Sequence, residues 1–192
     1  MFCKALNKIL SVLKTLLVHG NVEIGKGSIL FWKASIRNKG GKIIIGDNVI
    51  IGRDKRNYHC GMPFYTTLFT DAEEAVLSIG DNCRINGAYI HCKKHISIGK
   101  NCVIASGVNI LDSNGHAICS ENRTIGGDDE AKDIIIGENV WIGINAIILK
   151  DTVIGNNCIV SAGSVVKGPF EDNTIIQGNF ARSVKKIDPY QM

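Results

Sequence analysis

Hydrophobic positions along this chain follow a six-residue rhythm. Glycine often comes directly after the aliphatic residue, and a small or medium-sized side chain usually lies four positions after it. A helix favours a period of about 3.6 residues and a plain strand a period of about 2, so the pattern fits neither a helix nor a hairpin meander. The residues that fall six apart are Ile45 and Ile51; Ile79 and Ile85; Ile98, Ile104 and Ile110; and Ile136, Ile142, Ile148, Ile154, Val160 and Val166.

This pattern predicts a β-solenoid. Each six-residue unit makes one short strand and one corner, and three units close a coil of about 18 residues. Coils stack about 4.8 Å apart, the usual distance between paired strands. The first aliphatic residue of each unit then points inward, and the next glycine permits a tight corner because it tolerates positive φ. The fifth position also faces inward, which explains Cys83, Cys102 and Cys158 as small buried hydrophobes.

Two segments, 53–75 and 112–133, interrupt the rhythm, and it does not reach either end of the chain. Insertions leave a solenoid as loops at its corners, and loops on a rigid scaffold often carry function. We therefore expect a β-helix over residues 21–168 with two inserted loops, followed by a short C-terminal tail over residues 169–192.

The N-terminal segment has a different period. Its apolar residues recur three and four apart, with lysines mostly between them: Phe2, Leu6, Ile9, Leu13, Leu16 and Leu17. This spacing predicts an amphipathic helix over residues 1–20, with Gly20 as a natural stop. We expect the apolar face to pack on the rest of the protein or on a neighbouring subunit. Contact of this basic helix with an acidic membrane surface is the less favoured alternative.

Composition excludes several classes of protein. The chain is 45% hydrophobic and 21% charged, as expected for a globular domain with an aliphatic core. Its net charge of +4 is too weak and too dispersed to indicate a nucleic-acid partner. The seven cysteines are odd in number and form no CxxC pair, which argues against a disulfide framework and a zinc ribbon. No apolar run reaches the roughly 20 residues of a membrane helix, and no signal-peptide cleavage site is evident, so we expect a cytoplasmic protein.

A resemblance to a known family lies in the segment IGENVWIGINAIILKDTVIGNNCIVSAGSVV, residues 136–166. Its NVWIG and AGSVV elements are typical of the hexapeptide-repeat acyltransferases. The chain is most similar to the sugar O-acetyltransferases of the galactoside, maltose and nodulation-factor type and to their relatives in surface-polysaccharide synthesis. DSNGH at residues 112–116 and GNFARSVKKI at residues 178–187 extend the similarity.

The resemblance implies an all-β fold, a left-handed parallel β-helix, which is an exception to the usual right-handed crossover rule. It also implies a homotrimer with active sites between adjacent subunits. The activity it implies is transfer of an acetyl group from acetyl-CoA to a sugar hydroxyl, without a metal ion. The setting would be the biosynthesis of a surface polysaccharide such as capsule, O-antigen or exopolysaccharide.

His116 matches the family histidine that begins the extruded loop and takes the proton from the acceptor hydroxyl. Imidazole suits this role because its pKa of about 6.5 lets it act as a base near neutral pH. Asp112 is either the group that orients this ring or an Asx-turn residue that caps the corner. Asn86 matches by its spacing the family asparagine that hydrogen-bonds the sugar acceptor; the alternative is a corner residue, because asparagine also tolerates left-handed geometry.

The resemblance places the acyl donor in a groove along residues 142–167. Trp141 matches the tryptophan that lines the pantetheine arm, and the N–H near Ile144 would receive the developing oxyanion. Ala162 and Gly163 would let the pantetheine approach the backbone. The residues expected to meet the phosphates of the coenzyme are Lys167, Arg182 and Lys185.

Several positions depart from the family pattern. KGPF stands at residues 167–170 where the family usually has TKD[IV]P, and Phe180 stands where it has proline. The N-terminal cap with the sugar-binding aspartate of the galactoside and maltose enzymes has no match. These differences point away from free galactosides and maltose as acceptors and towards a nucleotide-linked or lipid-linked sugar.

Three other functions compete with this hypothesis. An N-acyltransferase of an amino sugar would use the same donor on a better nucleophile. A non-catalytic solenoid, serving as a scaffold or trimerisation module, would bind no acyl-CoA. A metal-dependent hydratase similar to the gamma-class carbonic anhydrases would need three converging histidines, for which His91, His95 and His116 are the candidates. Their spacing does not match that family, and the VWIG and AGSVV elements would have no role.

Overall fold

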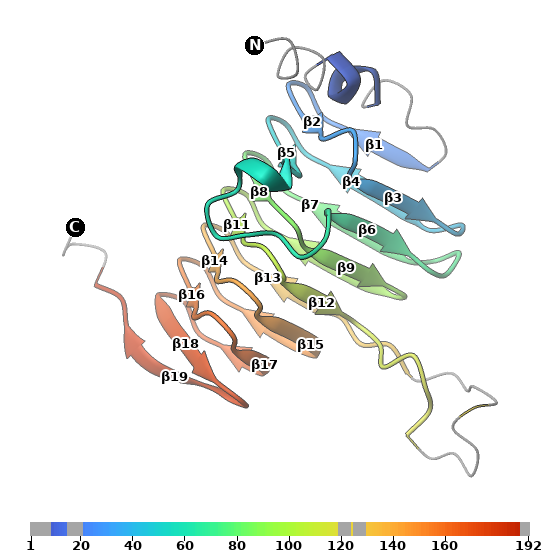
Figure 1. Ribbon diagram of the computed structural model, residues 1–192. Coiled ribbons are helices and arrows are strands. Elements are labelled where there is room, and N and C mark those ends of the chain that lie inside the picture. Colours follow the sequence, from blue (N-terminus) through green and yellow to red (C-terminus); the bar gives the residue numbers. More distant parts are fainter. Residues whose placement is uncertain (1–8, 15–20, 119–123, 125–129, 189–192) are drawn as a thin grey trace.

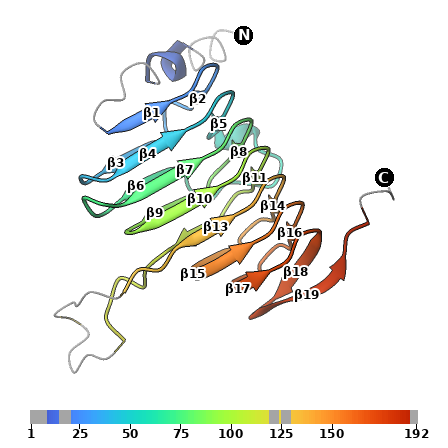
Figure 2. The ribbon, with the colours of Figure 1, turned by 180° about the vertical axis from the view of Figure 1, so that it is seen from behind.

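The computed structural model describes residues 9–14, 21–118, 124 and 130–188 of the chain. Its strands wind into a three-sided coil whose turns are stacked along one axis (Figures 1 and 2). All the pairings between the described strands are parallel except that of the last strand, β19. The predicted fold class, an all-β left-handed parallel β-helix, is confirmed.

Each side of the coil is one face of the solenoid. The first face holds β1 (Val22–Ile24), β4 (Lys42–Ile45), β7 (Val76–Ile79), β10 (His95–Ile98) and β13 (Ile134–Ile136). The second face holds β2 (Ile29–Leu30), β5 (Ile50–Ile51), β8 (Arg84–Ile85), β11 (Val103–Ile104), β14 (Trp141–Ile142), β16 (Ile159–Val160), β18 (Thr174–Gly178) and β19 (Ala181–Lys186). The third face holds β3 (Ser35–Asn38), β6 (Thr67–Thr70), β9 (Tyr89–Cys92) and β12 (Asn109–Leu111). Two longer strands, β15 (Ile147–Ile154) and β17 (Val165–Phe170), run from the third face onto the first.

The six-residue series forms the core. Every residue of the predicted series is at most 2% exposed, and residues of successive coils lie in register. On the second face, for example, Ile85, Ile104 and Ile142 are aligned across β8, β11 and β14. Burying each such side chain contributes about 1.5–3 kcal/mol, and a one-residue slip would turn the whole column outward. This repeated burial explains why the register is kept from coil to coil.

The buried cysteines confirm their predicted place in the core. Cys83, Cys102 and Cys158 are free thiols with almost no exposed surface. Each thiol donates to a backbone carbonyl of the next coil, at 3.1–3.2 Å. Burial raises the pKa of the Cys158 thiol, which keeps it protonated near neutral pH.

At the corner between the first and second faces, the expected role of glycine as the residue with positive φ is wrong. The glycine after the inward isoleucine does not have a positive φ there; the left-handed residue is the asparagine two positions later, as at Asn82 and Asn101 with φ near 60°. Glycine is needed for a different reason, since a Cβ on Gly80 would lie 2.6 Å from the backbone nitrogen of Lys100 in the next coil. The side chain of Asn82 donates to that of Asn101 at 3.2 Å, which links the coils at their corners.

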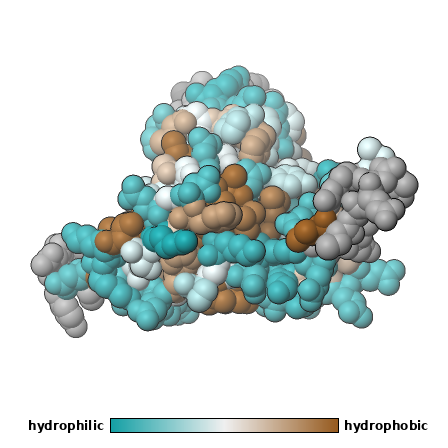
Figure 3. All heavy atoms as spheres, turned by 90° about the horizontal axis from the view of Figure 1, so that it is seen from below, coloured by the Kyte–Doolittle hydropathy of each residue, from teal (hydrophilic) through white to brown (hydrophobic). Residues whose placement is uncertain are grey.

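The predicted interruptions and tail are more structured than the rhythm indicated. The first insertion carries the short 3₁₀ helix η1 (Lys55–Asn57), and the coil resumes with β6, which pairs with β3 and β9. The expected tail contains β18, which continues the second face, and β19, which turns back along it. Seen from this end, apolar side chains lie in the middle of a largely polar surface (Figure 3).

The N-terminal helix is described over residues 9–14, and the rest of the predicted helix lies outside the described residues. Of the predicted apolar face, Ile9 and Leu13 are described, and neither is buried on the solenoid of its own chain. Ile9, Val12 and Leu13 face away from the solenoid, while Ser11 is buried against it. The helix is held through polar contacts instead, because the corner beneath it offers backbone groups. In the ranges that the structure describes, no helix has the length and hydropathy needed to cross a bilayer.

Candidate active site

An apolar groove lies on the outer side of the second face. Val103, Trp141, Ile159 and Ile175 stand in register on β11, β14, β16 and β18. They point outward because the residue after each of them belongs to the buried column. Val103 and Trp141 remain 42% and 54% exposed, so the row presents a contiguous apolar surface and not an isolated side chain.

The first insertion supplies a wall of this groove. Tyr58, His59 and Cys60 follow η1 and border a cavity of about 670 Å³. Burial raises the pKa of Tyr58, so its hydroxyl stays protonated near neutral pH. Sequence reasoning missed these three residues; the aromatic run YHCGMPFY was the available signal, but nothing in it showed which face the insertion covers. The other lining residues are Val103, Ala105, Trp141, Gly143, Ile144, Ile159, Val160, Ser161, Ala162 and Ile175.

Three of the residues expected to hold the acyl donor lie together in this groove, namely Trp141, Ile144 and Ala162. Gly163 follows directly, with φ of +70° and open space where a Cβ would be. Among the residues that the structure describes, no acceptor takes the backbone N–H of Ile144 or of Ala162. These N–H groups are therefore available to an oxyanion or a ligand carbonyl.

The cationic residues divide between two sides of the molecule. Arg182 pairs with Gln177 and Lys185 with Ile175, and a register shift between Ile175 and Ile176 lies between these pairs. Residues three apart in a regular strand point to opposite faces, but the shift places both cations on the face of Ile175, beside the groove. Lys167 lies on β17, near the corner between the third and first faces, and is not brought to the groove.

Asp112 is held by the coil before it. Its carboxylate is fully buried and accepts the backbone N–H of Lys93 at 2.8 and 2.9 Å and that of Lys94 at 2.7 Å. Its own carbonyl accepts the N–H of Lys132, which joins the two ends of the second insertion at 2.9 Å. The structure therefore gives Asp112 the partners of a corner cap, across coils rather than within an Asx turn.

His116 and Asn86 lie at opposite ends of the third face. His116 is exposed and follows β12, whereas Asn86 is buried and precedes β9, the strand paired with β12. The length of these strands, roughly 13 Å, separates the two positions. Within the described part of the chain no donor reaches the buried Oδ1 of Asn86, an arrangement that usually marks a missing partner.

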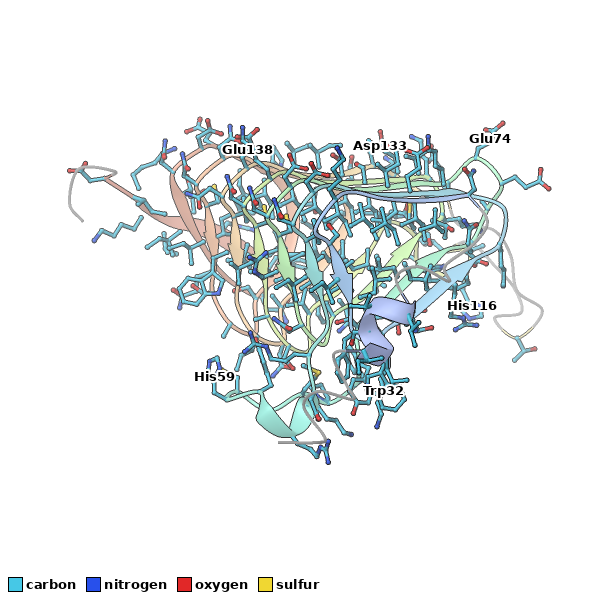
Figure 4. The ribbon with its side chains drawn as sticks, turned by 90° about the horizontal axis from the view of Figure 1, so that it is seen from above. Trp32, His59, Glu74, His116, Asp133 and Glu138 are labelled. Carbon is cyan, nitrogen blue, oxygen red and sulfur yellow. The ribbon has the colours of Figure 1, made fainter. Side chains whose placement is uncertain are left out.

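One chain does not bring His116 to the groove. The loop of His116 leaves the corner between the third and first faces, and the groove lies on the second face. Figure 4 shows this separation, with His116 on one side of the solenoid and His59, at the groove, on another. An active site that uses both needs a second copy of the chain.

Two stretches of the chain match known repeat families. Residues 133–168 match the family described as bacterial transferase hexapeptide (six repeats), and residues 76–111 match the hexapeptide repeat of succinyl-transferase. A candidate acetyltransferase of Saccharomyces cerevisiae, YJL218W, is 32% identical over 139 residues, which cover 72% of this chain and 67% of that protein. The chain belongs to the hexapeptide-repeat acyltransferase family.

Two further similarities fit this membership in the hexapeptide-repeat acyltransferases. WbbJ of Escherichia coli K12, a candidate O-acetyl transferase of lipopolysaccharide biosynthesis, is 34% identical over 126 residues, or 59% of this chain and 62% of that protein. The chain thus spans about two-thirds of the length of these two relatives. A variant of AntD, an N-acyltransferase from Bacillus cereus in complex with dTDP and coenzyme A, shares the fold with a TM-score of 0.69 at 21% identity, over 93% of this chain and 89% of that one.

The histidines considered for a metal centre are spread over this hexapeptide-repeat solenoid. His91 Nε2 lies 3.2 Å from Asp71 Oδ2, and its ring stacks on Phe69 with centroids 4.9 Å apart. His95 is next to Asp133, on the first face, and His116 is in the second insertion. Among the described residues no three histidine, cysteine or acidic side chains are grouped as metal ligands.

Proposed function

We propose that this protein transfers an acetyl group from acetyl-CoA to a hydroxyl of a sugar acceptor. The observation that carries the proposal is the apolar groove of about 670 Å³ on the second face. Trp141, Ile144 and Ala162, which the family resemblance assigns to the donor, line it together. An apolar groove with free N–H groups suits a pantetheine arm, which is largely apolar but carries amides and ends in a thioester. Arg182 and Lys185 at its edge suit the coenzyme phosphates.

His116 is the proposed general base. A sugar hydroxyl is a poor nucleophile near neutral pH, and a well-placed imidazole that accepts its proton contributes about 10²- to 10⁴-fold. The N–H of Ile144 would donate to the oxyanion that forms when the hydroxyl attacks the thioester carbonyl. The leaving thiolate of coenzyme A would take the proton from the imidazolium, which returns His116 to its neutral form.

We infer that the working enzyme is a homotrimer with each site between two subunits. The geometry supports a second copy, because the groove and His116 lie on different sides of one chain (Figure 4), and the number three follows the family resemblance. The same reasoning applies to Asn86, which lies at the far end of the third face from His116. If both act on one acceptor, they come from different copies.

The proposed acceptor is a sugar of a surface polysaccharide, presented as a nucleotide-linked or lipid-linked precursor. The name of the relative WbbJ supports this setting. The chemistry of the product separates this proposal from N-acylation, since an acetyl ester is cleaved by mild alkali and an acetamide is not.

Calorimetric titration of the purified full chain with acetyl-CoA tests the donor half of the proposal. We expect micromolar affinity with about one site per subunit. The absence of binding to acetyl-CoA and to longer acyl-CoAs would refute acyl transfer and favour a scaffold.

Turnover of the His116→Ala variant tests the base. We expect a loss of at least about 100-fold in kcat with donor affinity unchanged. His95→Ala is the control, because His95 is a half-buried histidine on the first face, away from the groove, where it lies beside Asp133 at the end of the second insertion. Equal turnover of the two variants would remove His116 from its role.

A further inference from the structure

The helix over residues 9–14 presents its apolar side to the outside of the molecule. Ile9, Val12 and Leu13 are 57%, 43% and 47% exposed. Residues separated by three and four positions share one face of a helix, so these side chains form a single apolar patch. A soluble helix normally turns such a patch towards the core, and this one does the reverse.

Polar contacts on the opposite side of the helix hold it in this orientation. Ser11 Oγ accepts the backbone N–H of Trp32 at 3.2 Å. Lys14 donates from Nζ to the backbone carbonyls of Trp32 and Ala34. Burial lowers the pKa of Lys14, as expected for an ammonium group drawn in towards the protein. Rotating the helix to bury its apolar face would break these contacts.

Aromatic and basic side chains surround the place where the helix docks. Lys33 Nζ lies 4.7 Å from the ring centroid of Trp32 and 5.3 Å from that of Tyr65. Lys55, in the first insertion, lies 5.6 Å from the ring centroid of Tyr65. The helix and the insertion project from the same side of the solenoid, next to Trp32 (Figure 4). The helix that carries the apolar patch therefore docks on a corner that presents aromatic rings and ammonium groups.

We propose that this corner binds an anionic lipid surface, and we call it the lipid-facing corner: Ile9, Val12 and Leu13 with Trp32, Lys33 and Lys55. Aliphatic side chains of an interfacial helix enter the boundary between headgroups and acyl chains. Tryptophan and tyrosine favour the headgroup level, and lysines near the surface are attracted to anionic headgroups. An apolar patch alone would suit a protein groove, but the ammonium groups of the corner on which the helix docks favour anionic lipid. The inference goes beyond acyl transfer and does not depend on it.

Sedimentation of the full chain with lipid vesicles tests the lipid-facing corner. One set of vesicles is pure phosphatidylcholine and the other contains about one-third phosphatidylglycerol. We expect the protein to bind the anionic set more tightly, and to be released by 1 M salt, which shortens the Debye length to about 3 Å. Binding to neither set, or equal binding to both that salt does not affect, would overturn the proposal.

Two variants locate the contact. Leu13→Asp should weaken binding to the anionic vesicles at least about tenfold, and Lys33→Gln with Lys55→Gln should weaken it by about fivefold for each lysine. Val153→Asp is the matched control, because Val153 is also 47% exposed but lies on the first face, far from the helix. Equal binding by Leu13→Asp and Val153→Asp would overturn the assignment.

Light scattering and thermal melting of the same variants exclude the competing explanation. A second copy of the chain is the other occupant that the apolar patch would suit. If Leu13→Asp lowers the oligomer mass or the melting temperature while wild-type protein fails to bind anionic vesicles, the patch is a subunit contact and the lipid proposal is wrong. Unchanged mass and melting temperature, with binding lost, support it.

Discussion

Replacing Asp112 with asparagine separates the two roles that the sequence left open for this residue. The carboxylate accepts the N–H of Lys93 with both oxygens and that of Lys94 with Oδ2. Asparagine keeps one acceptor. If the asparagine oxygen takes the place of Oδ2, that oxygen still accepts both N–H groups. The asparagine NH₂ then takes the place of Oδ1 and faces the N–H of Lys93, so two donors oppose each other.

The size of the effect follows from these bonds. A hydrogen bond to a charged acceptor contributes about 1.5–3 kcal/mol and a neutral one about 0.5–1.5 kcal/mol. Replacing two charge-assisted bonds with two neutral ones therefore lowers the free energy of unfolding by about 2–3 kcal/mol. Asp112→Ala leaves both N–H groups buried and unpaired, and its loss should be about 3–6 kcal/mol.

Urea unfolding and steady-state kinetics measured on the same variant form the assay. As a corner cap, Asp112→Asn should lower the free energy of unfolding while the pH dependence of kcat keeps its midpoint. A carboxylate that orients the catalytic imidazole would instead give a loss of about 10⁴-fold in kcat with little change in stability. Asp133→Asn is the control, because its exposed carboxylate pairs with Lys94 Nζ at 2.9 Å and such surface pairs contribute about 0–1 kcal/mol. An Asp112→Asn protein as stable as the Asp133→Asn protein would refute the capping role.

Three further predictions concern the core, the groove and the first insertion. Ile142→Asp should abolish cooperative unfolding, because it places an unpaired carboxylate in the fully buried column. Val153→Asp, on the outside, should melt like wild type. An unchanged melting temperature for Ile142→Asp would show that the inward register is wrong. Alkylation of Cys60, mapped by mass spectrometry, should slow about tenfold when acetyl-CoA is present at ten times its Kd, and an unaffected rate would place the donor elsewhere. The pKa of Asp54 lies at about 2 because the side chain and backbone N–H of Arg56 bind its carboxylate. A carboxyl group whose pKa is lowered on folding stabilises the protein above about pH 4, and this stabilisation is lost as the pH falls towards 2. Between about pH 5 and about pH 2.5 the melting temperature of wild type should therefore fall further than that of Asp54→Asn. Parallel losses in the two proteins would contradict this.

Some of the site could be anticipated from local pattern alone. Trp141, Ile144 and Ala162 come from segments that occupy equivalent places in adjacent coils, so a regular repeat is enough to bring them onto one face. The same regularity carries no information about the insertion that walls the groove. Tyr58, His59 and Cys60 reach it because the first insertion leaves the corner next to the second face, and that depends on how residues 53–66 fold back.

The register shift in β19 shows a second limit of local pattern. Read as a regular strand, Arg182 and Lys185 point to opposite faces, and the sequence gives no sign of the extra residue between their pairs. Lys167, expected with them at the coenzyme phosphates, is on another side of the solenoid. The roles of all three, like that of His116, remain predictions.

The sequence by itself determined the solenoid, its inward column and its family. Each six-residue unit has the same pattern of inward and outward side chains, and each coil contacts only its neighbours, so the local pattern is enough to specify the stack. Only the tertiary structure decided where the exceptions go. It placed the Asp112 carboxylate on the N–H groups of the preceding coil and turned the apolar side of the N-terminal helix outward. It also set His116 on a different side from the groove. The helix and the loop of His116 lie outside the six-residue repeat, so no period in the sequence indicates which groups they will meet. The repeat does place Asp112 one coil after Lys94, but it does not show that the carboxylate turns to the backbone there.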